Sequence, residues 1–252
     1  MNRLSAAPLP PVTATAAARV PRSQLRDVPP SGLTQCLLTP LHYERNYAYP
    51  LLVWLHSTGG DEREVRRVMP HISLRNYAAL GVRGPGSEPS GYSWPQSPDM
   101  IASAEQTILE SVSRARLRFN IHPDRIFLAG YEGAGTMALR IALRHPDRFA
   151  GAASLNGPFP TGQAPLAMLA SARRLKLLSA HCRDSRSYPI ERVCRELSLF
   201  HCAGMAITLR QYPCEDELTT QMLHDLDVWL MEQVTGALSG QEHPAAAPAD
   251  WN

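Results

Sequence analysis

The stretch RIFLAGYEGAGTMALR, residues 125–140, predicts a buried strand, a sharp glycine-rich turn and a helix in direct succession. Its first part is a continuous apolar run, which is typical of a strand covered on both faces. A turn of this kind lifts one side chain above the edge of the sheet, and here that side chain is Glu132. We therefore expect a site around Glu132, next to the positive end of the helix that follows it.

Strands and helices alternate on both sides of this stretch. The alternation predicts an α/β fold with a mostly parallel central sheet and helices on both faces. In such sheets the ligand site lies at the carboxyl ends of the strands. A loop rich in glycine and proline is expected at 83–99, and 122–124 is expected to turn the chain into the central strand. The other strands are predicted at 34–39, 51–56, 77–82, 149–155, 175–180 and 205–211, and the helices from 62 and at 101–118, 133–144, 189–203 and 217–234.

Composition divides the chain into three parts. Residues 1–29 and 237–252 are rich in alanine and proline, which predicts disordered tails around one domain at 30–236. The net charge of +2 predicts no strong attraction to nucleic acid or to an anionic membrane. There is no apolar run of about 18 residues, so we expect no membrane span.

Five cysteines are present, at positions 36, 182, 194, 202 and 214. Their odd number, their irregular spacing and the lack of an export signal predict free thiols in the cytoplasm. No pair has the spacing of a zinc site, and we expect neither a metal nor a cofactor. Cys182 and Cys214 follow two strands that should be neighbours, so they are either two free thiols or a redox-sensitive pair.

Five segments resemble motifs of the α/β-hydrolases, and more narrowly of the small carboxylesterases and phospholipases. The stretch around Glu132 resembles the elbow Gly-x-Ser-x-Gly, in which the serine is the nucleophile. LHSTGG at 55–60 resembles Leu-His-Gly-x-Gly, and GYSW at 91–94 matches part of the loop after the next strand. HCRDSRSYP at 181–189 resembles His-Gly-x-x-Asp-x-x-x-Pro, and YPCEDEL at 212–218 resembles Tyr-Pro-x-Gly-His-Glu-Leu. The resemblance covers residues 33–235 and implies an α/β-hydrolase fold.

The same resemblance implies that the catalytic triad is degenerate. It places Glu132 at the nucleophilic serine and Asp216 at the histidine. The acid position falls on Ser185 when counted back from Pro189, or on Asp184 after a shift of one residue. A serine hydrolase needs a hydroxyl nucleophile, an imidazole base and a carboxylate that orients the imidazole. We therefore predict a catalytically inactive homologue of a serine carboxylesterase that retains a pocket for a small molecule or a protein.

Further site residues follow from the resemblance. Backbone N–H groups of Thr58 and Gly133 stand at the positions of the oxyanion hole, while Ser57 and Ala134 replace glycines of the motifs. Aromatic side chains at the mouth of a site can line an apolar pocket, or can simply pack a loop onto the domain. The residues expected around the pocket are His56, Ser57, Tyr92, Trp94, Tyr131 and His181.

The alternative is an active ester hydrolase with rearranged catalytic residues. It would draw on Glu132, Asp184 and either His181 or His56. As a nucleophile, Glu132 would still need a base for the second step, and its longer side chain would displace the reacting oxygen. A histidine within hydrogen-bond reach of Glu132 and of a second carboxylate would favour this alternative.

Two other interpretations remain open from the residues. Four carboxylates, those of Glu132, Asp184, Glu215 and Asp216, are expected at one edge of the sheet. Their repulsion can be offset by arginines or by a bound Ca²⁺ or Mg²⁺. The domain can also have a purely structural role and act in an assembly through its surface.

Overall fold

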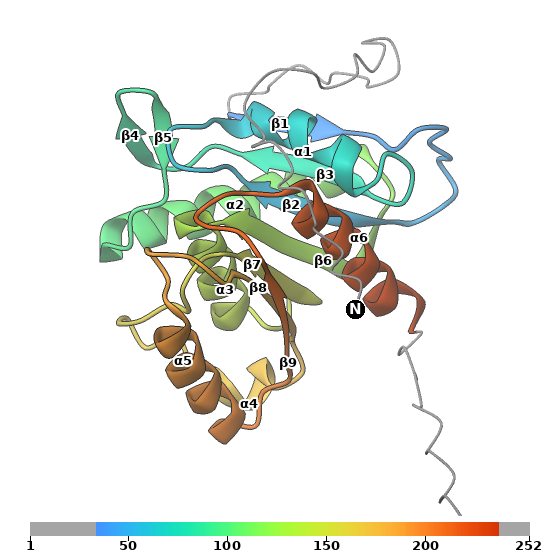
Figure 1. Cartoon of the computed structure of the whole chain (residues 1–252). Coiled ribbons are helices and arrows are strands. Elements are labelled where there is room, and N and C mark those ends of the chain that lie inside the picture. The colour runs from blue at the N-terminus through green and yellow to red at the C-terminus, as the bar shows by residue number, and fades with distance from the viewer. Residues whose placement is uncertain (1–33, 237–252) are drawn as a thin grey trace, which may run out of the picture.

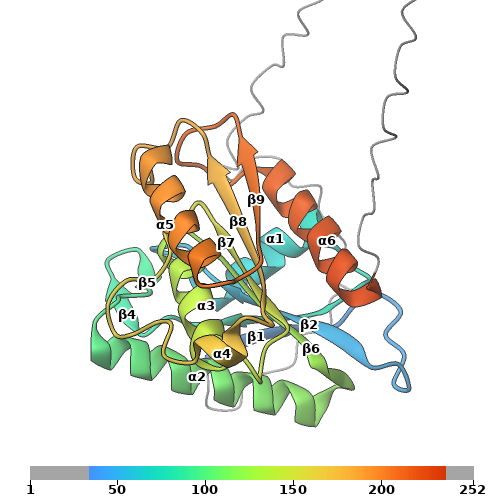
Figure 2. The ribbon, with the colours of Figure 1, turned by 90° about the horizontal axis from the view of Figure 1, so that it is seen from below.

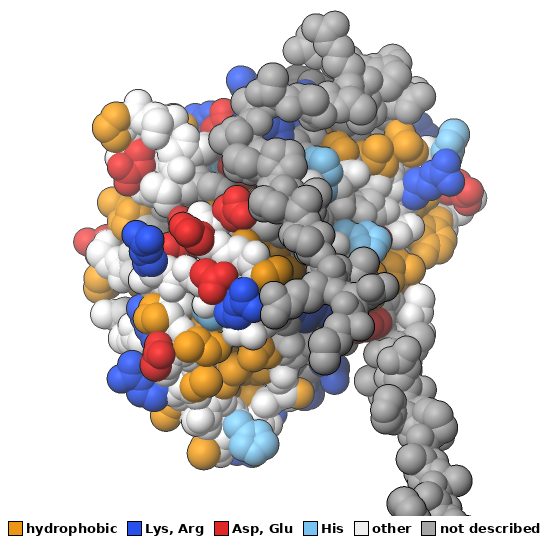
Figure 3. Space-filling view, viewed as in Figure 1, with side chains coloured by type: hydrophobic (Ala, Val, Ile, Leu, Met, Phe, Trp, Pro, Cys, Tyr) orange, Lys and Arg blue, Asp and Glu red, His pale blue; other side chains and the backbone are white. Residues whose placement is uncertain are grey.

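A computed structural model of the chain describes residues 34–236, which form a central sheet covered by helices on both faces (Figure 1, Figure 2). The expected tails at 1–29 and 237–252, and residues 30–33 of the expected domain, lie outside the described residues. On the face shown in Figure 3, acidic and basic side chains of the described residues are interspersed. No helix between residues 34 and 236 is both long enough and apolar enough to cross a membrane.

The large sheet has seven strands in the order β1-β3-β2-β6-β7-β8-β9. The first strand, β1, is antiparallel to β3, and all other neighbours are parallel. This confirms the predicted α/β fold and its mostly parallel sheet. The strands are β1 Gln35–Leu38, β2 Tyr49–Leu55, β3 Ala78–Val82, β6 Ile121–Tyr131, β7 Gly151–Leu155, β8 Lys176–Cys182 and β9 Ile207–Tyr212.

Two hydrophobic layers enclose the sheet. Alternate residues of β2 point to opposite faces, so that Val53 belongs to one layer and Trp54 to the other. Side chains of α2, α3 and α5 complete the first layer, and side chains of α1 and α6 complete the second. The helices are α1 Val65–Ile72, α2 Pro98–Arg118, α3 Gly133–Arg144, α4 Leu169–Ala172, α5 Ile190–Cys202 and α6 Thr220–Thr235.

Three local predictions need correction. The segment at 83–99 contains an antiparallel hairpin of β4 Gly86–Glu88 and β5 Gly91–Ser93, because short strands interrupted by glycine and proline give no clear alternation. Residues 122–124 lie inside β6, where the register with β2 shifts, and a bulge of this kind tolerates a proline. The helix expected from 62 begins as a 3₁₀ turn, η1 Glu62–Glu64. Asp61 caps this turn, since its carboxylate accepts from Arg63 N at 2.9 Å.

Candidate functional site

Glu132 occupies a strained turn between β6 and α3. Its φ of 50° and ψ of −122° lie in a region that residues other than glycine rarely adopt. Its N–H donates to Leu155 O at 2.8 Å, and its carbonyl accepts from Thr136 N at 3.0 Å. Gly157 packs against this turn so closely that a Cβ there would lie 2.1 Å from the Glu132 carbonyl oxygen. The neighbouring backbone therefore holds Glu132 in a strained conformation between β6 and α3.

The Glu132 side chain is half-buried, and burial raises the pKa of its carboxyl group. Tyr131 lowers this pKa and so partly offsets burial, while the charge of Asp216 raises it further. The Tyr131 hydroxyl is itself buried, and it makes no hydrogen bond of normal geometry to any residue between 34 and 236. Because its pKa is raised, the carboxyl group of Glu132 takes up a proton at a higher pH than an ordinary glutamate does.

Asp216 is held by five hydrogen bonds. Its carboxylate accepts from the hydroxyl of Ser185, from Ser187 Oγ at 2.7 Å and from Asn156 Nδ2 at 3.0 Å. The backbone N–H groups of Arg186 and Ser187 donate to its other oxygen at 3.1 and 3.2 Å. Burial opposes the charged form, but the hydrogen bonds prevail and lower the pKa of Asp216 to about 2. This carboxylate is therefore an anion that accepts protons poorly.

The depressed pKa of Asp216 predicts a pH-dependent contribution to stability. The group is charged at lower pH in the folded chain than in the unfolded chain, whose ordinary value is 3.8. Its contribution is thus complete above about pH 4 and is lost as the pH falls toward 2. In thermal unfolding, the Tm difference between the chain and Asp216→Asn should shrink over this range. A difference that stays constant from about pH 5 to pH 2 contradicts this picture.

Of the two candidates for the acid position, Ser185 is hydrogen-bonded to Asp216 and Asp184 is not. Ser185 is buried, with 7% exposed, and its hydroxyl also accepts from Tyr188 N at 2.9 Å. The Asp184 side chain is exposed and pairs with Arg183 at 3.4 Å. The sheet edge therefore joins a serine to a carboxylate at the two positions where the family motifs have an acid and a histidine.

Asn156 is a member of this cluster that was not among the predicted site residues. It follows β7 with a φ of 54°, a conformation in which asparagine is enriched. Its side chain is 1% exposed and bridges the two strand ends, because its Oδ1 accepts from Cys182 N at 3.2 Å while Nδ2 donates to Asp216. In the sequence, the Asn-Gly-Pro stretch directly after β7 was the feature that could have pointed to this position.

Both histidines near the strand ends are buried and bonded to the backbone. His56 Nδ1 donates to Ser57 O and His56 Nε2 accepts from Gly84 N, each at 2.9 Å. Burial lowers the pKa of His56, so the ring is neutral near pH 7. His181 Nε2 donates to Tyr188 O at 2.8 Å, and its buried Nδ1 has no partner among residues 34–236. Neither ring is hydrogen-bonded to Glu132 in this part of the chain.

The loop after β2 is fixed by a buried acid. Glu64 Oε1 accepts from Ser57 N, from Ser57 Oγ and from Trp54 Nε1, each at 3.0 Å. Trp94 Nε1 donates to the His56 carbonyl at 2.9 Å, while Thr58 is exposed to solvent. The indole and the imidazole therefore pack the loop onto the domain.

Tyr92 makes a similar packing contact on the hairpin. Arg83 lies over its ring, with 4.3 Å between the guanidinium carbon and the ring centroid, and Arg83 also pairs with Glu62 at 2.7 Å. The aromatic residue expected at the mouth of the site is thus stacked on an arginine.

A cavity of about 370 Å³ lies beside Glu132. Gly133, at the start of α3, borders it with room to spare, since a Cβ at Gly133 would meet nothing within 4 Å. None of the six residues expected around a pocket belongs to its lining, and neither do Thr58, Asp184, Ser185 and Asp216. The lining consists of Gln96, Glu132, Gly133, Thr136, Arg140, Asn156, Pro158, Phe159, Thr161, Ser187 and Arg192.

Two arginines give this cavity its charge. Arg140 is 1% exposed and donates to three neutral oxygens: Gln96 Oε1 at 2.9 Å, Thr161 O at 2.6 Å and Gly162 O at 2.9 Å. Arg192, on α5, donates to the buried Glu196 at 2.8 Å. Burial lowers the pKa of Arg140, whose guanidinium is enclosed with no carboxylate of residues 34–236 bonded to it.

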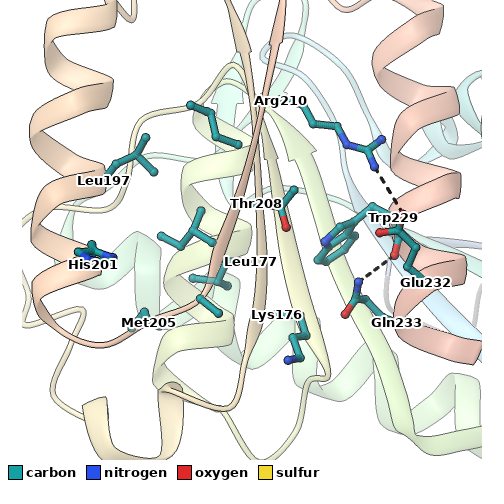
Figure 4. Close-up of a pocket in the computed structure, with 13 residues that line it drawn as sticks. Lys176, Leu177, Leu197, His201, Met205, Thr208, Arg210, Trp229, Glu232 and Gln233 are labelled. Atoms are coloured by element: carbon teal, nitrogen blue, oxygen red, sulfur yellow. Dashed lines mark hydrogen bonds and ion pairs between the residues drawn. The ribbon is translucent and has the colours of Figure 1, made fainter. Parts of the chain in front are cut away.

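A larger hollow, of about 690 Å³, lies away from Glu132 along the edge strand β9. It is lined by β9 and by residues of α5 and α6, with Trp229 and Met205 on its walls and Arg210 near Glu232 (Figure 4). None of the predicted site residues borders it. Within residues 34–236, no group of three or more histidine, cysteine or acidic side chains is arranged to hold a metal.

Comparison with known proteins agrees with this architecture. No family model matches the chain. NocK, a predicted esterase of Nocardia uniformis subsp. tsuyamanensis, is 33% identical over 126 residues. The match takes in 46% of the chain and spans only about a third of NocK, 35% of its length.

The structural matches are much more extensive. A carboxylesterase of Mesorhizobium loti matches with a TM-score of 0.67 at 18% identity, over 82% of this chain and 99% of that one. The Bacillus cereus carboxylesterase gives 0.65 at 15% identity, with coverages of 81% and 95%. SOBER1 of Arabidopsis thaliana gives 0.62 at 18% identity, with coverages of 74% and 100%. The chain therefore has the α/β-hydrolase fold, in the arrangement found in these carboxylesterase-like structures.

Proposed function

We propose that this protein is a non-catalytic homologue of a carboxylesterase that binds a small molecule in the cavity beside Glu132. The observation that carries the proposal is the state of Asp216. At the position that the resemblance assigns to the catalytic histidine, a carboxylate accepts five hydrogen bonds, one of them from Ser185. Both oxygens of this carboxylate, which is exposed to solvent, are already occupied by donors of the same cluster.

Ester hydrolysis by the serine mechanism needs a base that is neutral near pH 7 and becomes protonated during the reaction. Asp216, with a pKa of about 2, is a poor proton acceptor at that pH. His56 has both ring nitrogens engaged by the backbone. The protein retains the raised turn of a hydrolase while its proton-transfer groups are replaced.

The cavity favours a ligand with an anionic group. Arg140 and Arg192 supply two positive charges and Glu132 is the one carboxylate in the lining, while Arg192 is also paired with Glu196, which does not line the cavity. The first N–H groups of α3 begin at Gly133 and add the positive end of the helix dipole. A volume of about 370 Å³ lies at the lower end of the range for small-molecule sites. The backbone N–H groups of Thr58 and Gly133 are the proposed equivalents of the oxyanion-hole donors. Of these two residues, Gly133 lines this cavity and Thr58 does not.

Small probes test this binding site directly. Butyrate, butylamine and 1-butanol have similar size and differ in charge, and saturation-transfer NMR detects weak binding of each. We expect butyrate to give the strongest transfer. In Arg192→Gln its affinity should fall about tenfold, since a charge-assisted hydrogen bond is worth about 1.5–3 kcal/mol.

Arg195→Gln is the matched control, because Arg195 lies on the same helix, is exposed and does not line the cavity. It should leave butyrate binding unchanged. Equal transfer to butyrate and butanol, or an equal loss in both variants, contradicts the anionic preference.

One observation favours the alternative of an active ester hydrolase. Glu132 combines a raised pKa with a strained turn at a helix N-terminus, as an activated acid would.

The five cysteines are free, which fits the proposal that the protein works in the cytoplasm.

A further inference from the structure

Two buried cysteines meet behind the candidate site. Cys182 is the last residue of β8, opposite Tyr212 in the parallel pairing with β9, and Cys214 follows two residues later. The two sulfurs are 3.0 Å apart, with Cys214 Sγ as the donor. Cys182 is fully buried and Cys214 is 9% exposed.

The backbone imposes this contact. Arg183 N donates to Tyr212 O at 2.8 Å, and Asp184 N donates to Cys214 O at 3.0 Å, so the segments after β8 and β9 are joined beside the thiols. An S–S bond of about 2.05 Å requires the sulfurs to approach by only about 1 Å more. The other cysteines are placed differently: Cys36 lies on β1, and Cys194 and Cys202 are exposed on α5.

We propose that Cys182 and Cys214 are a modification site at which a reversible disulfide forms on oxidation. The oxidant is a small disulfide, R–S–S–R. The thiolate of Cys214, the more exposed of the two, attacks one sulfur and releases R–S⁻. The thiolate of Cys182 then attacks Cys214 Sγ and releases the second R–S⁻. Two electrons pass to the oxidant, and the two thiol protons convert the released thiolates into two R–SH.

Burial has two effects on this chemistry. It raises the pKa of both thiols, so that little thiolate is present near pH 7 and the pair reacts slowly. It also leaves little room for a bulky group to stay on Cys214, because the neighbouring sulfur is in contact with it. The disulfide is therefore the expected end product, and the mixed disulfide is an intermediate.

The bond would lie directly behind the Ser185–Asp216 contact. Cys182 precedes Ser185 by a short turn, in which Ser185 N donates to Cys182 O at 3.1 Å. Asp216 follows Cys214 at a similarly short distance along the chain. A disulfide would tie together the two segments that form this contact, and this proposal does not depend on the cavity binding a ligand.

Peptide mapping of the full chain tests the proposal. The purified protein is incubated with excess oxidised glutathione, its remaining thiols are blocked with N-ethylmaleimide, and it is digested with trypsin. Lysine and arginine positions place Cys182 in peptide 177–183, Cys214 in 211–252, Cys194 in 193–195 and Cys202 in 196–210. We expect 177–183 linked to 211–252, at ~2 Da below the summed masses, and separated by reductant.

Two variants and a stability measurement complete the test. Cys214→Ser should abolish the linked peptide, and Cys202→Ser should retain it. Oxidation of the unmodified chain should raise Tm by roughly 5–10 °C, and in Cys214→Ser it should not. Three results each overturn the proposal: a lasting glutathione adduct on Cys214, a link from Cys214 to another peptide, or an unmodified Cys214 after Cys202 has reacted fully.

Discussion

The triple variant Glu132→Ser, Ser185→Asp, Asp216→His is expected to hydrolyse p-nitrophenyl butyrate at least about 100-fold faster than the unmodified chain. The backbone already holds residue 132 at the strained φ of 50° that raises a side chain over the sheet edge. Residues 185 and 216 are already in hydrogen-bond contact through their side chains. The substitutions therefore place a hydroxyl, an imidazole and a carboxylate on an existing scaffold.

Single substitutions are the controls for this gain. Triad members act as a unit, so Glu132→Ser alone should stay close to the rate of the unmodified chain. Release of p-nitrophenolate is followed by absorbance, with circular dichroism to show that each variant is folded. A folded triple variant that is no faster than Glu132→Ser would show that the surrounding loops, and not only three side chains, have diverged.

Loss of the buried carboxylate at Glu64 should be the largest single effect on stability. Glu64 is 6% exposed and accepts three hydrogen bonds, from Trp54 Nε1 and from both the N–H and the hydroxyl of Ser57. In Glu64→Ala these donors lose their partner in a region that water reaches poorly. We expect the free energy of unfolding to fall by about 3–5 kcal/mol, measured by urea denaturation.

Arg67→Ala is the matched control for Glu64→Ala. The Arg67 side chain is 72% exposed and lies 3.6 Å from Glu64. Exposed ion pairs contribute little, so this variant should lose less than about 1 kcal/mol. Equal losses in the two variants would mean that the salt bridge, and not the buried hydrogen bonds, stabilises the loop.

The sequence predicted the architecture well because most of its signals are local. Apolar runs marked the strands, and the glycines next to Glu132 in the sequence marked the sharp turn. In the folded chain Gly157 also packs against this turn, with no space for a Cβ. The hairpin at β4 and β5 was missed, because its strands are three residues long and gain their order from pairing with each other.

The site was predictable only in part, since its contacts join segments far apart in the chain. A shift of one residue separates Asp184 from Ser185, and only the folded loop shows that Ser185 turns toward Asp216. The cavity is lined in part by Arg192 of α5 and by Pro158 and Phe159, which no motif connects with Glu132. The histidines and Trp94 were expected at a pocket, but they satisfy backbone groups in the interior.

The most direct test of the central claim is the turnover of p-nitrophenyl butyrate by the unmodified protein and by Glu132→Ala. The site described above has a carboxylate at the turn, a second carboxylate locked by five donors, and no histidine of residues 34–236 bonded to either. We predict that both proteins release p-nitrophenolate at the same low rate, close to that of buffer. Sustained turnover well above buffer that Glu132→Ala abolishes, in a variant that remains folded, would contradict the proposal that this protein is a non-catalytic hydrolase homologue.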